Sequence, residues 1–120
     1  MRNGEKNNLR IPPQNLDAEK ALLGSVMLRP EAIHDIIDII TAAVFYSEKH
    51  RIIWRTMLEL FGKNTPIDLL SLSSRLKEKN ELDTIGGASY LTELVNIVPS
   101  SANITHYAEI VYKKYMMRRL

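Results

Sequence analysis

A glycine–lysine pair is the first place in this sequence where residue types and spacing could do chemistry. A phosphate-binding loop needs Gly-x-x-x-x-Gly-Lys-Ser/Thr, because bare backbone amides must wrap the phosphates. Gly62-Lys63 is followed by Asn64, and Met57 stands where the first glycine of that loop would be. The pair is therefore interpreted as the end of a helix. Gly86-Gly87 lacks the glycine spacing of a dinucleotide-binding fingerprint and is interpreted as a turn.

Histidines, serines and carboxylates could also catalyse reactions or bind metal, but here they lack the required neighbours. His34, His50 and His106 are widely separated, with no paired ligands nearby, so a packed or hydrogen-bonded structural role is favoured for them. The serines have no partnered base, and Asp35 and Asp38 fit one solvated helix face. The chain has no cysteine, which excludes disulfides and thiolate metal sites. We expect no catalytic, cofactor-binding or metal-binding residue in this chain.

Basic and aromatic residues alternate near the end of the chain. Lys113-Lys114 and Arg118-Arg119 are interleaved with Tyr112 and Tyr115, a pattern that could contact a nucleic-acid backbone and stack on bases. However, the helix dipole also favours cations near a helix C-terminus, and the net charge is only +2. A solvated helix face is the preferred interpretation, and a nucleic-acid-binding helical module remains the alternative.

Two further side chains are candidates for partner binding because of their helical positions. Glu19 projects into an arc between apolar neighbours, where an unpaired buried carboxylate would be costly. It either takes capping hydrogen bonds from the start of its own helix, or lies at a partner-facing rim and meets an arginine or lysine from outside. Tyr90 flanks an apolar stripe beside the glycine break, so it is either the edge of the core or an interface anchor.

The last helix supplies the remaining candidates. Tyr107, Val111 and Tyr115 share one stripe, which indicates packing first. An isolated last helix could also leave an exposed apolar strip for a missing helical arm or another subunit. The candidate partner-binding residues are therefore Glu19, Tyr90, Tyr107, Val111 and Tyr115.

The elements that position these side chains all have helical signatures, and no sustained strand alternation is present. The first two expected helices run from the cap Asn15 to about Leu28, and from Pro30 through a stripe of Ile33, Ile36, Ile37 and Ile40. The next two run from the cap Ser47 to Phe61, with Gly62 as the stop, and from the cap Asp68 to near Asn80, with Leu69, Leu72 and Leu76 on one face. The last two run from Gly86-Gly87 to Pro99, and from a cap at Ser101 or Asn103 onward. A buried connector is expected at 41–46.

We therefore expect an all-α fold, a compact bundle of about six helices with short loops. The polar residues 1–10 are expected to be a flexible leader, 11–99 a globular helical subdomain, and 100–120 the beginning of a further helical element. No Gly or Pro interrupts the last helix before Leu120, so we expect it to be truncated. No apolar run approaches the roughly 20 residues needed to span a bilayer, and no membrane partner is expected.

Five short signatures are distributed along the chain. In order they are IPPQNLDAEKALLGSVML (11–28), Pro66-Ile67-Asp68, IGGASYL (85–91), PSSANITHYAEIVY (99–112) and Met117-Arg118-Arg119-Leu120. Each has an ordinary structural explanation when taken alone. Their order and spacing together resemble the N-terminal domain of DnaB-type replicative DNA helicases, and the resemblance covers nearly the whole chain.

The resemblance implies a collar that pairs helicase subunits in a hexamer, without catalysis in this fragment. It implies that the last helix is the first arm of a truncated helical hairpin, with the linker and ATPase domain absent. The implied partners are copies of itself, the C-terminal domain of primase and a helicase loader, with DNA contacted mainly through the ATPase domain. The full-length protein would be an ATP-dependent 5′-3′ DNA helicase of the bacterial cytoplasm that uses ATP and Mg²⁺, whereas this fragment would bind no cofactor.

Overall fold

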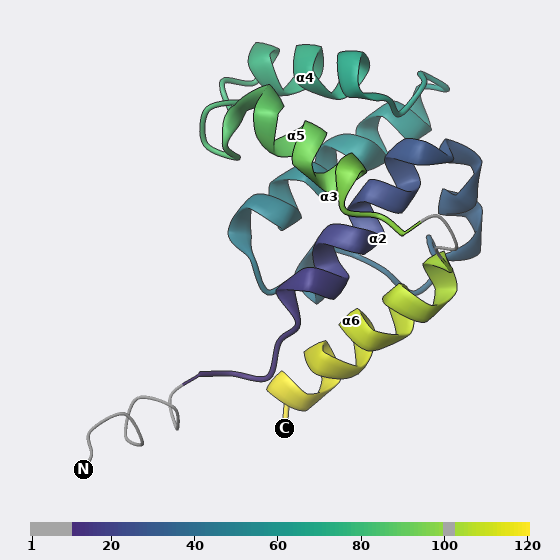
Figure 1. Cartoon of the computed structure of the whole chain (residues 1–120), viewed down its shortest axis with the longest axis vertical. Helices are drawn as coiled ribbons and strands as arrows, with labels where there is room; N and C mark the ends of the chain where they lie inside the picture. Colours follow the sequence, from purple (N-terminus) through teal and green to yellow (C-terminus); the bar gives the residue numbers. More distant parts are fainter. Residues whose placement is uncertain (1–10, 100–102) are drawn as a thin grey trace.

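The computed structural model describes residues 11–99 and 103–120, and these residues form helices joined by short loops (Figure 1). Over those ranges there are α-helices and two short 3-10 helices, and no strand. In chain order they are α2 (Leu16–Leu28), η1 (Pro30–Asp35), η2 (Ala42–Val44), α3 (Glu48–Gly62), α4 (Leu69–Glu78), α5 (Gly87–Asn96) and α6 (Ile104–Arg118). The all-α expectation is confirmed. The expected leader 1–10 and the alternative cap Ser101 lie outside the described residues.

The central element is α2, which packs against α6, α5 and α3 (Figure 1). It is apolar around most of its circumference, as expected for a helix that is covered on several sides. Its start is fixed by Asn15, whose side chain accepts a hydrogen bond from the amide of Ala18 at 2.9 Å. Because α2 touches α3, α5 and α6, a side chain on its surface can link elements that are distant in sequence.

A glycine allows α2 and α5 to approach closely. A Cβ atom added to Gly24 would lie 2.1 Å from the carbonyl oxygen of Leu94, far inside van der Waals contact. Any larger residue would force the two helices apart. Gly24 therefore determines the distance between the helix that carries Glu19 and the helix that carries Tyr90.

The caps predicted at Asp68 and Asn103 are confirmed, since their side chains accept hydrogen bonds from backbone amides at 2.8 and 3.2 Å. The predicted stop at Gly62 is confirmed, since Gly62 is the last residue of α3, but this glycine does not take the left-handed conformation. The left-handed residue is Asn64, at φ 57°, and the amide of Thr65 donates to the carbonyl oxygen of Leu60 at 2.9 Å. This is the hydrogen bond of a Schellman ending.

The isoleucine stripe does not form the expected α-helix. Pro30–Asp35 is a 3-10 helix, and turns follow it. A dense run of β-branched isoleucines lowers α-helix propensity, because these side chains lose rotamer freedom against the preceding turn. The stripe still points inward: Ile33, Ile36 and Ile40 are buried, and Ile37 is partly buried.

Four other expectations need adjustment. Leu69 is 39% exposed, so the buried face of α4 begins at Leu72 rather than at the first residue of the helix. α4 ends at Glu78, and Asn80 takes a left-handed φ of 60° just after it. α5 ends at Asn96, before Pro99, because a proline disfavours helical conformation in the residue that precedes it. The connector 41–46 is buried at Val44 and Phe45, but Tyr46 is exposed.

The last helix is not isolated, contrary to expectation, because α6 packs along α2 (Figure 1). Ile104, Ala108 and Val111 on its inner side are buried. Its outer side nevertheless keeps an apolar surface. Among the helices over 11–99 and 103–120, none is long and apolar enough to cross a membrane.

Candidate interaction surface

Three of the long helices are joined by a buried chain of polar side chains. Nδ1 of His50, on α3, lies 2.7 Å from the Glu19 carboxylate on α2, and Nε2 lies 2.6 Å from the hydroxyl of Tyr90 on α5. Since a carboxylate can only accept, Nδ1 donates to Glu19, and in the tautomer that carries only this proton Nε2 accepts from the Tyr90 hydroxyl. We call Glu19, His50 and Tyr90 the buried triad. Each of them is less than a tenth exposed.

The Glu19 carboxylate also binds the backbone at the start of α3. It accepts hydrogen bonds from the amides of Tyr46, at 2.6 Å, and Ser47, at 3.3 Å. Ser47 occupies the N-cap position, but its own side chain makes no capping hydrogen bond. The positive end of the α3 dipole further favours a carboxylate there. Glu19 therefore stabilises the N-terminus of a different helix from its own.

This arrangement differs from both interpretations of Glu19 made from the sequence. The carboxylate does not cap α2, because its hydrogen bonds go to residues at the start of α3. It does not lie at a rim that awaits an external arginine, because Glu19 is only 1% exposed and His50 is its ionisable neighbour. A contribution of Glu19 to partner binding must therefore act through His50 and Tyr90. The structural role favoured for His50 agrees with its two hydrogen bonds.

Tyr90 connects the buried triad to the molecular surface. Its hydroxyl is buried against His50, while the Nζ of Lys49 lies 3.8 Å from the centre of its ring. Burial, followed by the negative charges of Glu93 and Glu19, raises the pKa of Tyr90 to about 12. The phenol is therefore a stable hydrogen-bond donor, and because Tyr90 is only 8% exposed, little of its ring is left for a partner to contact.

The three candidates on α6 have different surroundings. Val111 is 2% exposed and belongs to the core, whereas Tyr107 and Tyr115 are partly buried and pack against it. Two guanidinium groups lie near the Tyr115 ring, with Arg118 at 5.8 Å and Arg119 at 5.6 Å from its centre. Of these three, only the two tyrosines keep surface that a partner could touch.

Arg118 has a structural role that the sequence did not reveal. Its guanidinium donates to the carbonyl oxygens of Pro13, at 2.9 Å, and Val44, at 2.8 Å. These bonds tie the end of α6 to the segment that enters α2 and to η2. The guanidinium is thus already engaged within the chain, which weakens the nucleic-acid interpretation of the basic C-terminal residues.

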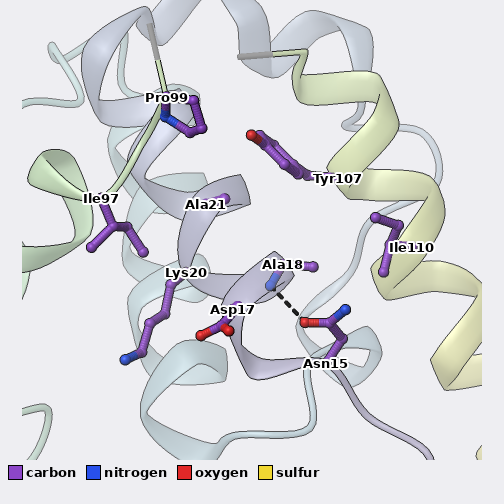
Figure 2. A pocket seen from close by; sticks show the side chains of 9 residues that line it. All are labelled: Asn15, Asp17, Ala18, Lys20, Ala21, Ile97, Pro99, Tyr107 and Ile110. Carbon is purple, nitrogen blue, oxygen red and sulfur yellow. Dashed lines mark hydrogen bonds between the residues drawn. The ribbon is translucent and has the colours of Figure 1, made fainter. Parts of the chain in front are cut away.

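A groove runs between α2, the end of α5 and α6 (Figure 2), with a volume of about 410 Å³. Its middle is lined by the apolar side chains of Ala18, Ala21, Ile97 and Ile110. Tyr107 and Pro99 lie at one end, and Asn15, Asp17 and Lys20 lie at the other (Figure 2). We call this cleft the α2–α6 groove. It places the candidate Tyr107 opposite the first helix.

The outer side of α6 carries a second apolar surface. Its large apolar side chains are Tyr112 and Met116, each about two-fifths exposed, and the 42% exposed Ile39 lies beside them, with the charged Glu109 and Lys113 next to these residues. We call Ile39, Tyr112 and Met116 the α6 face. Exposed apolar clusters of this kind mark interaction sites more often than isolated exposed residues do.

No grouping of His, Cys, Asp or Glu within 11–99 and 103–120 could hold a metal ion. The polar side-chain atoms of the buried triad have their hydrogen-bond partners within the chain. The fold and the side chains of the described part thus define an all-α module whose distinctive surfaces suit contact with macromolecules.

The particular family is given by comparison with known sequences. The family described as "DnaB-like helicase N terminal domain" matches residues 11–113. The chain belongs to this family, which confirms the resemblance found from the sequence signatures.

Curated relatives agree with this assignment. The chain is 42% identical over 113 residues to the replicative DNA helicase DnaC of Bacillus subtilis (strain 168), covering 94% of this chain and 25% of that protein. It is 41% identical over 111 residues to the replicative DNA helicase DnaB of Geobacillus stearothermophilus, covering 92% of this chain and 24% of that protein. The chain thus spans about a quarter of the length of these relatives.

Two solved structures share the fold. The crystal structure of the N-terminal domain of DnaB helicase from Mycobacterium tuberculosis matches 92% of this chain and 79% of that chain, with a TM-score of 0.88 and 37% identity. A DnaB-like replicative helicase, described with its interactions with primase, matches 88% of this chain and 25% of that chain, with a TM-score of 0.78 and 34% identity.

Proposed function

We propose that this chain is the interaction collar of a replicative DNA helicase, which pairs helicase subunits and docks the C-terminal domain of primase. Catalysis, ATP and Mg²⁺ belong in this proposal to an ATPase part of the protein outside this chain, and most DNA contact does too. A helicase loader is a further proposed partner. We place the complete protein in the bacterial cytoplasm, because the relatives are bacterial helicases.

One observation carries the proposal: the likeness over 88% of this chain to a helicase described together with its interactions with primase. The side chains provide independent support. The described residues offer two apolar surfaces, the α6 face and the α2–α6 groove, and they hold no grouping that could bind a metal. A module of this composition is suited to holding proteins together rather than to transforming a substrate.

Subunit pairing is proposed for the α6 face. Pairing needs an apolar surface that stays exposed when the module is folded, and Tyr112 and Met116, with Ile39 beside them, form such a surface on the helix that packs along α2. A second helix laid along this face would bury Met116, whose flexible side chain adapts to a partner. The same helix is well anchored, because Arg118 ties its end to the rest of the fold.

The experiment compares the complete helicase with a version that lacks residues 1–120, and measures primase binding and subunit assembly. The proposal predicts loss of primase binding on deletion. A Met116→Lys variant is expected to weaken assembly. The matched control is Leu70→Lys, which introduces the same charge at an apolar residue of α4 that is 76% exposed. A deleted protein that assembles and binds primase normally would contradict the proposal.

A further inference from the structure

We propose that the α2–α6 groove receives one large apolar side chain of a partner protein, together with an adjacent lysine or arginine that pairs with Asp17. The inference rests on the proposed function only in taking the occupant to be a protein. The preference of the groove for an apolar group linked to a cation follows from its own residues.

The apolar part of the groove is built to admit a side chain. Ala18 and Ala21 project little beyond the α2 backbone, which leaves space between Ile97 and Ile110 (Figure 2). Ile97 faces this space, and 40% of its surface is exposed to solvent. A volume of about 410 Å³ lies toward the small end of typical ligand sites, which span roughly 300–1,000 Å³. One aliphatic or aromatic side chain would cover the exposed isoleucine surface.

The charges at the rim favour a cation over an anion. The ammonium group of Lys20 is already paired with Glu93 at 3.2 Å, so these two charges largely offset each other. Within 11–99 and 103–120, the exposed carboxylate of Asp17 has no hydrogen-bond or ion-pair partner. Counting the side chains of the described residues, the charge left over at this end of the groove is negative, and the N-terminus of α2 offsets only part of it. A partner that brings a lysine or arginine complements it, whereas a phosphate or a carboxylate is disfavoured.

The geometry also sets the spacing of the two groups on the partner. Asp17 lies at the open end of the groove, and Ala21 lies one helical turn further along α2 (Figure 2), a separation of about 6 Å. A basic residue four positions from the inserted apolar residue on a helix, or two positions from it on a strand, points to the same side and spans this separation. Tyr107, at the far end, closes the apolar part.

The test uses two small probes that share the same apolar group, 4-phenylbutylammonium and 4-phenylbutyrate. Each is titrated into the isotope-labelled chain, and amide shifts are followed by NMR. We expect millimolar binding of the cation with shifts localised to the residues around Ala21, Ile97 and Ile110, and about threefold weaker binding of the anion, as for one exposed ion pair. In Asp17→Asn the preference should disappear. In the control Asp38→Asn, an exposed aspartate outside the groove, it should persist.

Equal binding of the two probes would overturn the inference, as would shifts outside the groove or a preference that survives in Asp17→Asn. These outcomes are independent of the proposed function, because they require no primase and no second helicase domain. A chain that binds primase but shows no cation preference would overturn the groove assignment alone. A chain that shows the preference but never binds primase would overturn the proposed partner alone.

Discussion

The buried triad predicts that Glu19 and Tyr90 are energetically coupled, although their hydrogen bonds join each of them to His50 and not to one another. Glu19→Gln keeps the shape of the side chain, but it places an amide NH₂ donor where three groups already donate hydrogen bonds to the carboxylate. With hydrogen bonds to a charged acceptor worth roughly 1.5–3 kcal/mol each, we expect a loss of about 2–3 kcal/mol. Tyr90→Phe removes one hydroxyl and leaves Nε2 of His50 unpaired, at a cost of about 1–2 kcal/mol.

The double variant should cost less than the sum of the two single variants. Once Glu19→Gln has released the imidazole from its fixed orientation, removing the Tyr90 hydroxyl costs less free energy of unfolding. We therefore expect a coupling of about 0.5–2 kcal/mol between the two substitutions. Urea unfolding of this chain measures it, with fluorescence of Trp54, the single tryptophan and a fully buried one, as the signal. Tyr90→Phe combined with the distant Glu59→Gln is the control and should be additive. Additivity of the triad pair within about 0.3 kcal/mol would refute the coupling through His50.

Three further perturbations follow from the packing and the ion pairs. Gly24→Ala should destabilise the chain by about 2 kcal/mol or more in thermal unfolding, because its Cβ would lie 2.1 Å from a carbonyl oxygen of α5. Gly62→Ala, which meets nothing within 4 Å, should instead stabilise by about 0.5 kcal/mol; equal effects would contradict the close approach. Arg118→Met should lower the free energy of unfolding in urea by about 1–3 kcal/mol, because it loses two hydrogen bonds. The control Arg119→Met should lower it by less than about 0.5 kcal/mol. Similar losses for the two variants would show that the hydrogen bonds of Arg118 do not stabilise the fold. The pKa of Glu59 is lowered, first by a hydrogen bond from an arginine of α4. Its ionised carboxylate therefore contributes about 0.5 kcal/mol to the stability of the fold, which is present above the usual pKa of 4.5 and is lost as pH falls through the lowered pKa. A stability difference between the chain and Glu59→Gln that grew on acidification would contradict this.

Local signals in the sequence predicted the helix starts well. Asn15, Asp68 and Asn103 each precede an apolar helical pattern, and each side chain caps the helix that follows it. These signals depend on a few neighbouring residues, so they survive whatever the tertiary arrangement. The helix endings were harder, because a left-handed asparagine such as Asn64 competes with a nearby glycine for the same role.

The polar contacts between helices could not be predicted from the sequence. Glu19, His50 and Tyr90 lie on three helices, and their meeting depends on how each helix is rotated about its axis and how closely α2 approaches α5. Gly24 determines that approach, and a lone glycine inside an apolar helix was the available signal for it. The contact of Arg118 with Pro13 spans nearly the whole chain, and no pattern in the sequence pairs a C-terminal arginine with two backbone carbonyls.

The interaction role is tested most directly by an NMR titration of the isotope-labelled chain with the C-terminal domain of the primase from the same organism, at moderate salt. We predict saturable shifts confined to one surface, at the α6 face, around the α2–α6 groove or beside Tyr90. Shifts that are absent even with primase in large excess, measured on a chain whose spectrum is that of a folded protein, would contradict docking by this module.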